Sequence, residues 1–345
     1  MCGIHTFMKC GTNYIYFNGN QNIKMTKTTT KVRLNTQQFA QTYYGERGYR
    51  EMLQNILDYG YTHVDRTGVG RRKLFSQKLV FDLQDTFPLH SSRPCPLSFA
   101  FKEYQAFLSG RSDIHDILSK EGIDFWKGNT SREFLDKAGL THVAEGNMAK
   151  AYGFQLRNYN GDFDEITQQA IPDSGVDQIK EVFESLKKNP FGSRHYVTMW
   201  NPAQLQEMAL PPCWHSHQWL VIEHEGVKFL NLEVTSRSAD ILYGTPFNIQ
   251  QYAYFLKAFS DALEMTPALL TCELIDAHLY ENQIEFTKEL LTRKFSEEPC
   301  SIEFKKKLST VEDIISLTMD DITVSMPDEF VNKEKFVTPK PTMAV

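Results

Sequence analysis

Residues 227–280 change their hydrophobic period twice, and this change limits the folds that the chain can adopt. The stretch VKFLNLEVTSRS alternates, with Leu230, Leu232 and Val234 on one side, as a half-buried strand does. The next stretch, FNIQQYAYFLKAFSDAL, spaces its apolar residues as a helix does, at Ile249, Tyr252, Leu256, Phe259 and Leu263. TCELIDAHLY then returns to the composition of a strand. A helix bounded by two strands predicts an α+β fold.

Similar patterns continue over residues 49–345. Helices are predicted in YREMLQNILDYG, FAFKEYQAFLSG and VDQIKEVFESLKKN, with Ser174 as a candidate N-cap of the last one. Strands are predicted in KLVFDL, HYVTMWN and HQWLVIE. No internal repeat, Gly/Ser linker or low-complexity block interrupts this region, whereas residues 1–45 are polar and rich in Thr, Asn, Gln and Lys. We therefore expect an N-terminal extension over residues 1–45 and one domain over residues 46–345.

The charge balance narrows the classes of function. The chain holds 37 basic and 43 acidic residues, for a formal net charge of −6. Proteins that coat nucleic acids carry a basic excess, so no nucleic-acid partner is expected. An anionic small molecule would instead need a local group of arginines.

Cysteine usage and hydropathy indicate the compartment. The six cysteines show no CxxC or framework spacing, which in a chain of this length is typical of reduced thiols in the cytoplasm. The sequence has no run of 18 apolar residues and no signal-peptide pattern at its start. We expect a cytoplasmic protein that has neither a membrane partner nor a metal.

Cys213 is the first candidate for chemistry. In LPPCWHSHQW it follows two prolines at the entry to a predicted strand. Most lone cysteines are small buried hydrophobic residues, and this explanation stays open. A nucleophilic role requires a nearby cation that stabilises the thiolate, and Arg66, Arg194 and Arg237 are candidates. His215 and His217 are each either a base or a packing residue.

The segment RSADILYGTPFNIQQYA offers groups that bind a nucleotide. Arg237 and Ser238 end a predicted strand, where a guanidinium and a hydroxyl bind phosphate together. Asn248 carries a donor and an acceptor, which match the edge of an amide-like base such as uracil. Its alternative role is an ordinary helix N-cap.

Together these segments resemble the thymidylate synthase family over nearly all of residues 50–345. The motifs that carry the resemblance are DRTGVG (65–70), FPL with RPC (87–95), KEYQAFLSG (102–110), FWKGNTSREFLDKAG (125–139), AYGFQLR (151–157), NPFGSRHYVTMWNP (189–202), ALPPC (209–213), RSADILYGTPFNIQQYA (237–253), DAHLYENQ (276–283) and the terminal MAV.

The resemblance implies a large mixed β-sheet with flanking helices, packed against its copy in a homodimer. It implies one-carbon transfer from 5,10-methylenetetrahydrofolate, a co-substrate, to C5 of dUMP. In this chemistry a thiolate adds to C6 of the uracil and makes C5 nucleophilic. Thymidylate synthases then deliver hydride and release dihydrofolate, whereas related phage hydroxymethylases add water and release tetrahydrofolate.

The resemblance also implies a role for individual residues. Cys213 corresponds to the nucleophile, Glu103 to the carboxyl group that manages protons, and Tyr152 to a tyrosine near C5. Asn248 corresponds to the amide that reads the uracil. The implied substrate contacts are Arg66, Arg194, Arg237, Ser238, Gln218, His278 and Tyr280. Arg194 is expected to reach the partner's phosphate site across the dimer. The implied folate contacts are Trp126, Asn129, Asp240, Gly244 and Val345.

Several residues depart from the family pattern. Trp214 follows the nucleophile where thymidylate synthases have His, Ala106 replaces a Trp, and Gln283 replaces a His. The loop MAKAYG replaces LGPVYG. Because lost bulk and an altered loop would admit water, these changes favour a phage-type deoxyuridylate hydroxymethylase, with thymidylate synthase as the alternative. A nucleotide-binding protein without turnover is the third hypothesis. The phage deoxycytidylate enzymes carry Asp at the position of Asn248, so uracil is the expected base.

Overall fold

The computed structural model describes residues 9–10, 13–14, 34–64, 68–93 and 95–327. The chain divides into two units, residues 1–38 and 39–345. In the first unit, β1 (Lys9–Cys10) and β2 (Asn13–Tyr14) form a short antiparallel hairpin. The rest of the predicted N-terminal extension lies mostly outside the described residues. Residues 42–44 form a strand of the second unit's sheet, so that sheet begins before residue 46.

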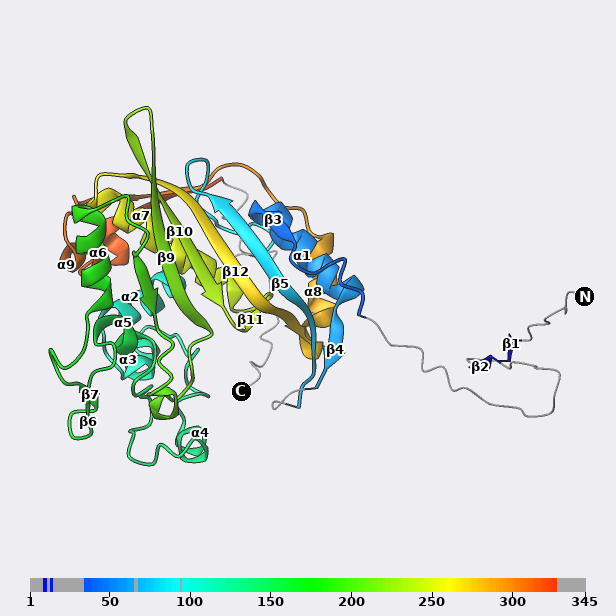
Figure 1. The fold of residues 1–345 in the computed structure, drawn as a ribbon, viewed down its shortest axis with the longest axis horizontal. Helices are drawn as coiled ribbons and strands as arrows, with labels where there is room; N and C mark the ends of the chain where they lie inside the picture. The colour runs from blue at the N-terminus through cyan, green and yellow to red at the C-terminus, as the bar shows by residue number, and fades with distance from the viewer. Residues whose placement is uncertain (1–8, 11–12, 15–33, 65–67, 94, 328–345) are drawn as a thin grey trace, which may run out of the picture. The chain divides into compact units, whose positions relative to one another are not determined.

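The second unit is built on one mixed sheet, as Figure 1 shows. Its strands lie in the order β3 (Thr42–Tyr44), β5 (Arg71–Asp82), β12 (Thr266–Tyr280), β10 (Val227–Ser236), β9 (Trp214–His224) and β8 (Tyr196–Thr198). Two short strands, β4 (Tyr61–His63) and β11 (Ala239–Asp240), pair with β5 and β12. β10 and β12 are parallel, whereas β9 and β10 form an antiparallel hairpin. The predicted α+β class with a large mixed sheet is therefore confirmed.

The hairpin turn follows from its sequence. Glu225 and Gly226 both have positive φ, at 51° and 79°. Two such residues in a row are typical of the two-residue turns that match the twist of paired strands, and Gly adopts this conformation without steric cost. The turn thus fixes the register in which β9 and β10 pair.

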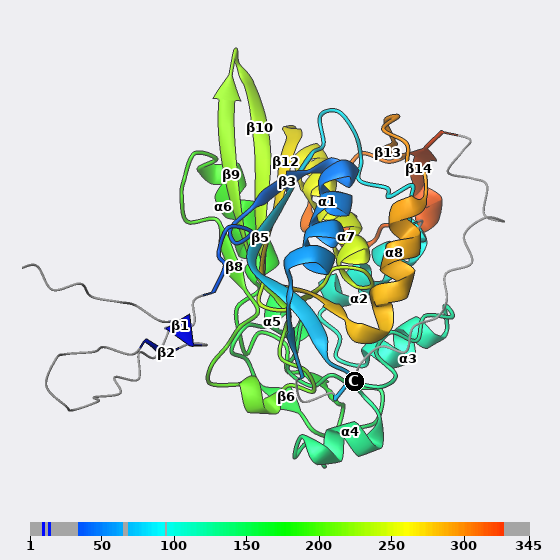
Figure 2. The same ribbon diagram turned by 90° about the vertical axis from the view of Figure 1, so that its right-hand side faces the viewer.

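The helices of the core lie on one side of the sheet, as Figure 2 shows. They are α1 (Gly45–Tyr59), α2 (Leu97–Leu108), α7 (Thr245–Ala262) and α8 (Ile284–Thr292). α7 connects the parallel strands β10 and β12, and it is buried almost all round. Its rings pack on the sheet, where Phe259 stacks on Trp219 at 4.7 Å between ring centroids. A helix without a polar face is typical of a core position.

The other elements border this core. The helices are α3 (Ile114–Ser119), α4 (Arg132–Lys137), α5 (Gly153–Arg157), α6 (Gln178–Lys188) and α9 (Val311–Ile315). The strands are β6 (Phe163–Asp164), β7 (Gln169–Ala170), β13 (Ser301–Phe304) and β14 (Ile322–Ser325), and 3₁₀ turns cover Leu205–Glu207, Glu281–Gln283 and Met319–Asp321. Among the residues described, no helix combines the length and apolar character needed to cross a bilayer.

The cap predicted for α6 was wrong. The N-cap is Asp177, whose carboxylate accepts from the Lys180 N–H at 3.1 Å, and not Ser174. Ser174 instead accepts from the Asp162 N–H at 2.8 Å in a separate turn. Ser and Asp are both good N-caps, so the sequence alone did not distinguish two candidates three residues apart.

Candidate functional site

Three strands end or begin at the same edge of the sheet, and this arrangement gathers the motifs. The first residue of β9, Trp214, pairs with the last residue of β10, Ser236. Because β10 and β12 are parallel, their C-terminal ends meet at the same edge. Cys213 immediately precedes β9, Arg237 and Ser238 follow β10, and His278 lies near the end of β12.

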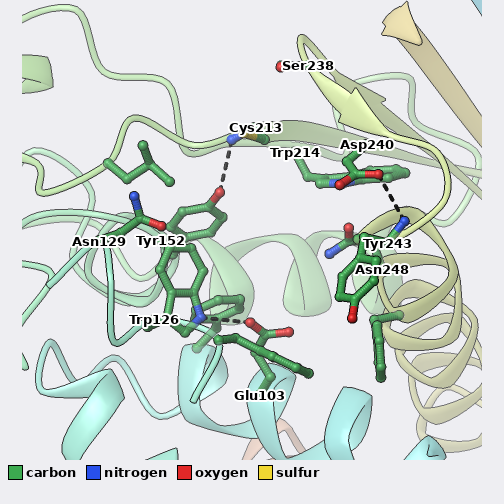
Figure 3. A pocket seen from close by; sticks show the side chains of 15 residues that line it. Glu103, Trp126, Asn129, Tyr152, Cys213, Trp214, Ser238, Asp240, Tyr243 and Asn248 are labelled. Atoms are coloured by element: carbon green, nitrogen blue, oxygen red, sulfur yellow. Dashed lines mark hydrogen bonds between the residues drawn. The ribbon is translucent and has the colours of Figure 1, made fainter. Parts of the chain in front are cut away.

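A pocket of 190 Å³ opens beside this edge (Figure 3). It is lined by Glu103, Phe107, Phe125, Trp126, Asn129, Tyr152, Leu210, Cys213, Trp214, Ser238, Asp240, Tyr243, Gly244, Phe247 and Asn248. Ten of these residues were candidates from the sequence. α2, the start of α7 and the loop before β9 therefore bring together side chains that are up to 145 positions apart in the chain, from Glu103 to Asn248.

The sulfur of Cys213 lies next to a cation. A guanidinium nitrogen of Arg237 is 3.9 Å from Cys213 Sγ. The same guanidinium donates to the carbonyl oxygens of Pro211 at 2.8 Å and Pro212 at 3.0 Å, and lies over the ring of Trp200. These contacts hold Arg237 against the loop that carries the thiol. A fixed positive charge at this distance stabilises an anionic sulfur.

Tyr152 holds the other side of the Cys213 loop. Its hydroxyl oxygen accepts from the Cys213 backbone N–H at 3.0 Å, and its ring stacks on Phe107 at 4.9 Å. The backbone of Tyr152 has φ 39°, which is strained for a residue with a side chain. Strain of this kind is concentrated at functional sites, where the surrounding packing maintains it. Burial raises the pKa of the Tyr152 hydroxyl well above its usual range, so it stays protonated at neutral pH.

Glu103 is a buried carboxyl group at the base of the pocket. Trp126 Nε1 donates to its Oε1 at 2.7 Å, and Gln251 Nε2 donates to its Oε2 at 2.5 Å. Burial raises the pKa of Glu103 to about 7, although both hydrogen bonds act to lower it. A carboxyl group that titrates near neutral pH can both give and take a proton.

Two residues outside the predicted set position the polar groups. Gln251 accepts from Asn248 Nδ2 at 3.0 Å and so connects Asn248 to Glu103. Gln283 Nε2 donates to Asp240 Oδ2 at 2.8 Å, and the Tyr243 N–H donates to Asp240 Oδ1 at 2.9 Å. Gln283 was noted only as a departure from the family pattern. Gln251 was detectable, because it lies one helical turn after Asn248.

Most of the site residues that the sequence analysis did not name are apolar or aromatic residues of the pocket walls. The residues that the sequence analysis missed are Phe107, Phe125, Leu210, Tyr243 and Phe247. Each lies within four positions of a predicted site residue, but polar chemistry had guided the search. Phe125 and Phe247 meet edge to face at 5.1 Å and make one wall aromatic.

Of the residues that depart from the family pattern, Trp214 lines the pocket and Ala106 does not. Trp214 lines the pocket, as predicted, and its ring lies 5.6 Å from that of Tyr252. Ala106 is buried in the hydrophobic core and does not line the pocket. Its neighbour Phe107 lines the pocket instead, one helical turn after Glu103. Ala106 is therefore not part of the pocket wall.

Besides Arg237, six more predicted residues fall outside the pocket lining or the described residues. His278 is buried with its Nδ1 3.1 Å from the Asp276 carbonyl oxygen, and its ring meets that of Tyr280. Gln218 and Arg194 are exposed, and Gln218 donates to the Ser193 carbonyl oxygen at 3.3 Å. Arg66 and Val345 lie outside the described residues.

The two histidines after the nucleophile differ in burial. Burial lowers the pKa of His217 to about 3, and its Nδ1 accepts from the indole N–H of Trp219 at 3.0 Å. His217 is therefore a neutral packing residue. His215 is half-buried, and burial together with the Arg237 charge lowers its pKa. Within the described residues, no group of three His, Cys, Asp or Glu is placed to hold a metal ion.

Comparisons with known proteins agree with this geometry. A family model described as Thymidylate synthase matches residues 47–329. Thymidylate synthase from Saccharomyces cerevisiae is 35% identical over 279 residues, which cover 78% of this chain and 90% of that protein. Thymidylate synthase from Bos taurus is 34% identical over 242 residues, 70% of this chain and 67% of that protein. The bifunctional dihydrofolate reductase-thymidylate synthase of Leishmania major is 36% identical over 293 residues, 85% of this chain and 55% of that protein. The chain therefore belongs to the thymidylate synthase family.

Proposed function

We propose that this protein is a thymidylate synthase, which converts dUMP to dTMP with 5,10-methylenetetrahydrofolate as the one-carbon donor. Family membership makes the chain a folate-dependent enzyme of nucleotide C5 chemistry. The observation that carries the proposal is the position of Cys213 Sγ, 3.9 Å from Arg237 in a pocket that also holds the buried carboxyl of Glu103.

Cys213 and Glu103 divide the chemistry between them. The thiolate of Cys213 is the nucleophile that adds to C6 of the uracil, and Arg237 stabilises its charge before the attack. Glu103, with a pKa of about 7, moves protons to and from the base near neutral pH. Tyr152 keeps the Cys213 backbone in place through its hydroxyl.

The remaining polar residues bind the nucleotide. Asn248 lines the pocket next to the aromatic wall and reads the uracil edge. Arg237 and Ser238 bind the phosphate, and His278 and Tyr280 at the end of β12 bind the sugar. Arg66 and Gln218 complete this set of substrate contacts.

The pocket walls suit a flat reduced folate ring. Phe125, Trp126 and Phe247 provide aromatic faces, and Asp240 provides a carboxylate for ring N–H groups. Asn129, Gly244 and Val345 complete the proposed folate contacts. The folate supplies the one-carbon unit and, in methylation, the hydride. The protein's own residues bind, orient and exclude water.

Hydroxymethylation is the second candidate, and Trp214 is the observation that favours it. Trp214 lines the pocket at the position where thymidylate synthases carry His. The small side chain of Ala106 and the altered loop over residues 148–151 support hydroxymethylation less than the sequence suggested, because neither lines the pocket. The matching relatives are named thymidylate synthases, which supports methylation better.

The active form is proposed to be a homodimer. Arg194 is exposed and does not line its own chain's pocket, which suits a residue that reaches the phosphate site of a partner. The face of the sheet opposite the helices carries exposed apolar side chains, among them Tyr196, Leu220 and Ile222. A second copy that covers this face would bury them.

One incubation distinguishes the two products and tests the proposal. The protein is mixed with dUMP and methylenetetrahydrofolate, the nucleotide product is identified by mass, and absorbance reports dihydrofolate. We expect dTMP and dihydrofolate in equal amounts. 5-Hydroxymethyl-dUMP with tetrahydrofolate would establish the second candidate, and Cys213→Ser serves as the inactive control.

A further inference from the structure

Four side chains at the pocket form a continuous row of hydrogen bonds. Trp126 donates to Glu103 at 2.7 Å, Gln251 donates to Glu103 at 2.5 Å, and Asn248 donates to Gln251 at 3.0 Å. Trp126, Glu103 and Asn248 line the pocket, whereas Gln251 lies behind them and is 2% exposed. Gln251 is therefore the one member of this row that does not line the pocket.

The row has a fixed direction. An indole N–H can only donate, and an ionised carboxylate can only accept. Gln251 must therefore turn its NH₂ group to Glu103, which leaves its carbonyl oxygen for Asn248. Asn248 in turn must present its NH₂ group to that oxygen. The polarity of the Asn248 amide follows from Glu103 through Gln251.

This polarity has a consequence for base recognition. With its Nδ2 turned to Gln251, Asn248 has its Oδ1 available as an acceptor for the pocket. Uracil carries a donor at ring N3, whereas cytosine carries an acceptor there. A fixed acceptor matches the first base and repels the second, and a mismatched pair of this kind is costly when buried.

We propose that Gln251 is a specificity-determining positioning residue, which fixes the amide of Asn248 so that the site selects a base with an N–H at ring N3. The inference rests on the proposed function, because it takes the nucleotide to be the ligand that Asn248 reads. It assigns the choice of base to a residue that does not touch the base. Without Gln251, Asn248 is free to rotate by 180° and present either group.

The test compares nucleotide affinities in variants of neighbouring glutamines. Gln251→Met keeps the length of the side chain but neither donates nor accepts. Gln250→Met is the matched control, because Gln250 is equally buried on α7 but donates to the Cys95 carbonyl oxygen, at 3.3 Å, away from the pocket. Binding of dUMP and of dCMP is measured by calorimetry above pH 8, where Glu103 is mostly ionised.

We expect the ratio of dUMP to dCMP affinity to fall about tenfold or more in Gln251→Met and to stay unchanged in Gln250→Met. If the Met variant does not fold, Gln251→Ala with water in the space gives the same expected loss. A merely structural role would instead lower both affinities together and leave the ratio intact.

The outcomes separate this inference from the proposed function. An unmodified protein that prefers dUMP, with a Gln251→Met or Gln251→Ala variant that keeps the same ratio, overturns the inference alone. An unmodified protein that binds neither nucleotide overturns the proposed function and the inference with it. Because binding needs no turnover, the comparison holds whichever product the enzyme forms.

Discussion

Glu103 shows how one buried group serves chemistry at a cost in stability. The residue is 6% exposed, and the hydrogen bonds from Trp126 and Gln251 offset only part of the loss of water around its carboxyl. Burial without an adjacent cation raises the pKa of a carboxyl, and here it raises the pKa of Glu103 to about 7. The folded protein therefore holds this proton more tightly than the unfolded chain does.

The raised pKa predicts a pH-dependent loss of stability. As pH rises from about 5 to 8, the unfolded state loses the Glu103 proton first, so the free energy of unfolding falls by up to about 3 kcal/mol. Glu103→Gln should remove this dependence and be relatively more stable at pH 8 than at pH 5. Denaturant unfolding at both pH values measures the effect, with the exposed Glu298→Gln as the control. An identical pH dependence in Glu103→Gln and the unmodified protein would contradict the raised pKa.

Cys213 gives the second prediction at this scale. Cys213→Ser should lose turnover by several orders of magnitude, because an alcohol is far less acidic than a thiol and Arg237 cannot make it anionic. Nucleotide binding should persist, because Arg237 stays held by Pro211 and Pro212. Turnover and dUMP affinity are measured separately. Substantial remaining turnover would exclude covalent catalysis.

Residue chemistry pointed to Cys213 and Asn248, whereas Glu103 and Tyr152 came from the family resemblance. Cys213, Glu103, Tyr152 and Asn248 were all named from the sequence, and all line one pocket. Gln251 was missed. Its position one helical turn after Asn248 was visible in the sequence, but its contact with Glu103, 148 positions away, was not. The misplacement of Ala106 has the same origin, since the face that a residue presents depends on how α2 packs.

At the scale of elements, α7 links stability to function. Its first turns carry Gly244 and Asn248 at the pocket, and its later turns form the centre of the core. Phe255 is fully buried and packs on Tyr104, Trp219 and Phe259. The strict helical spacing predicted this helix, but the spacing did not reveal that all its sides are covered.

Truncation of Phe255 tests how much the packing of α7 contributes to the free energy of unfolding. Phe255→Ala should lower the free energy of unfolding by about 3–5 kcal/mol, because a buried ring is lost and a cavity remains. Ile166→Ala, at a side chain that is 93% exposed, should change it by less than about 0.5 kcal/mol. Equal effects of the two substitutions would mean that α7 is not packed as described.

At the scale of the whole second unit, the sheet has two different faces. Residues such as Trp219 and Val221 on β9 point to the helices and are buried. Their neighbours Leu220 and Ile222 point the other way and are 47% and 53% exposed. Successive side chains of a strand point to opposite faces of the sheet. The face that carries Leu220 and Ile222 therefore holds apolar side chains that the described helices do not bury. The alternation along β10 was visible in the sequence, whereas the partner that packs on the exposed face was not.

A second copy of the chain is the proposed partner of the exposed face that carries Leu220 and Ile222. If a second copy packs on the open face, a charge placed there must be buried and left unpaired, which destabilises the assembly. Ile222→Glu, together with Leu220→Glu, should therefore shift the protein from dimer to monomer in analytical ultracentrifugation. The control is Ile166→Glu, which adds one negative charge at an exposed side chain on the connection between β6 and β7. Because Arg194 is proposed to complete the partner's phosphate site, the monomeric variant should also bind dUMP more weakly than the control. An unmodified protein that sediments as a monomer, or a monomeric variant with undiminished dUMP affinity, would show that each chain's site is complete alone.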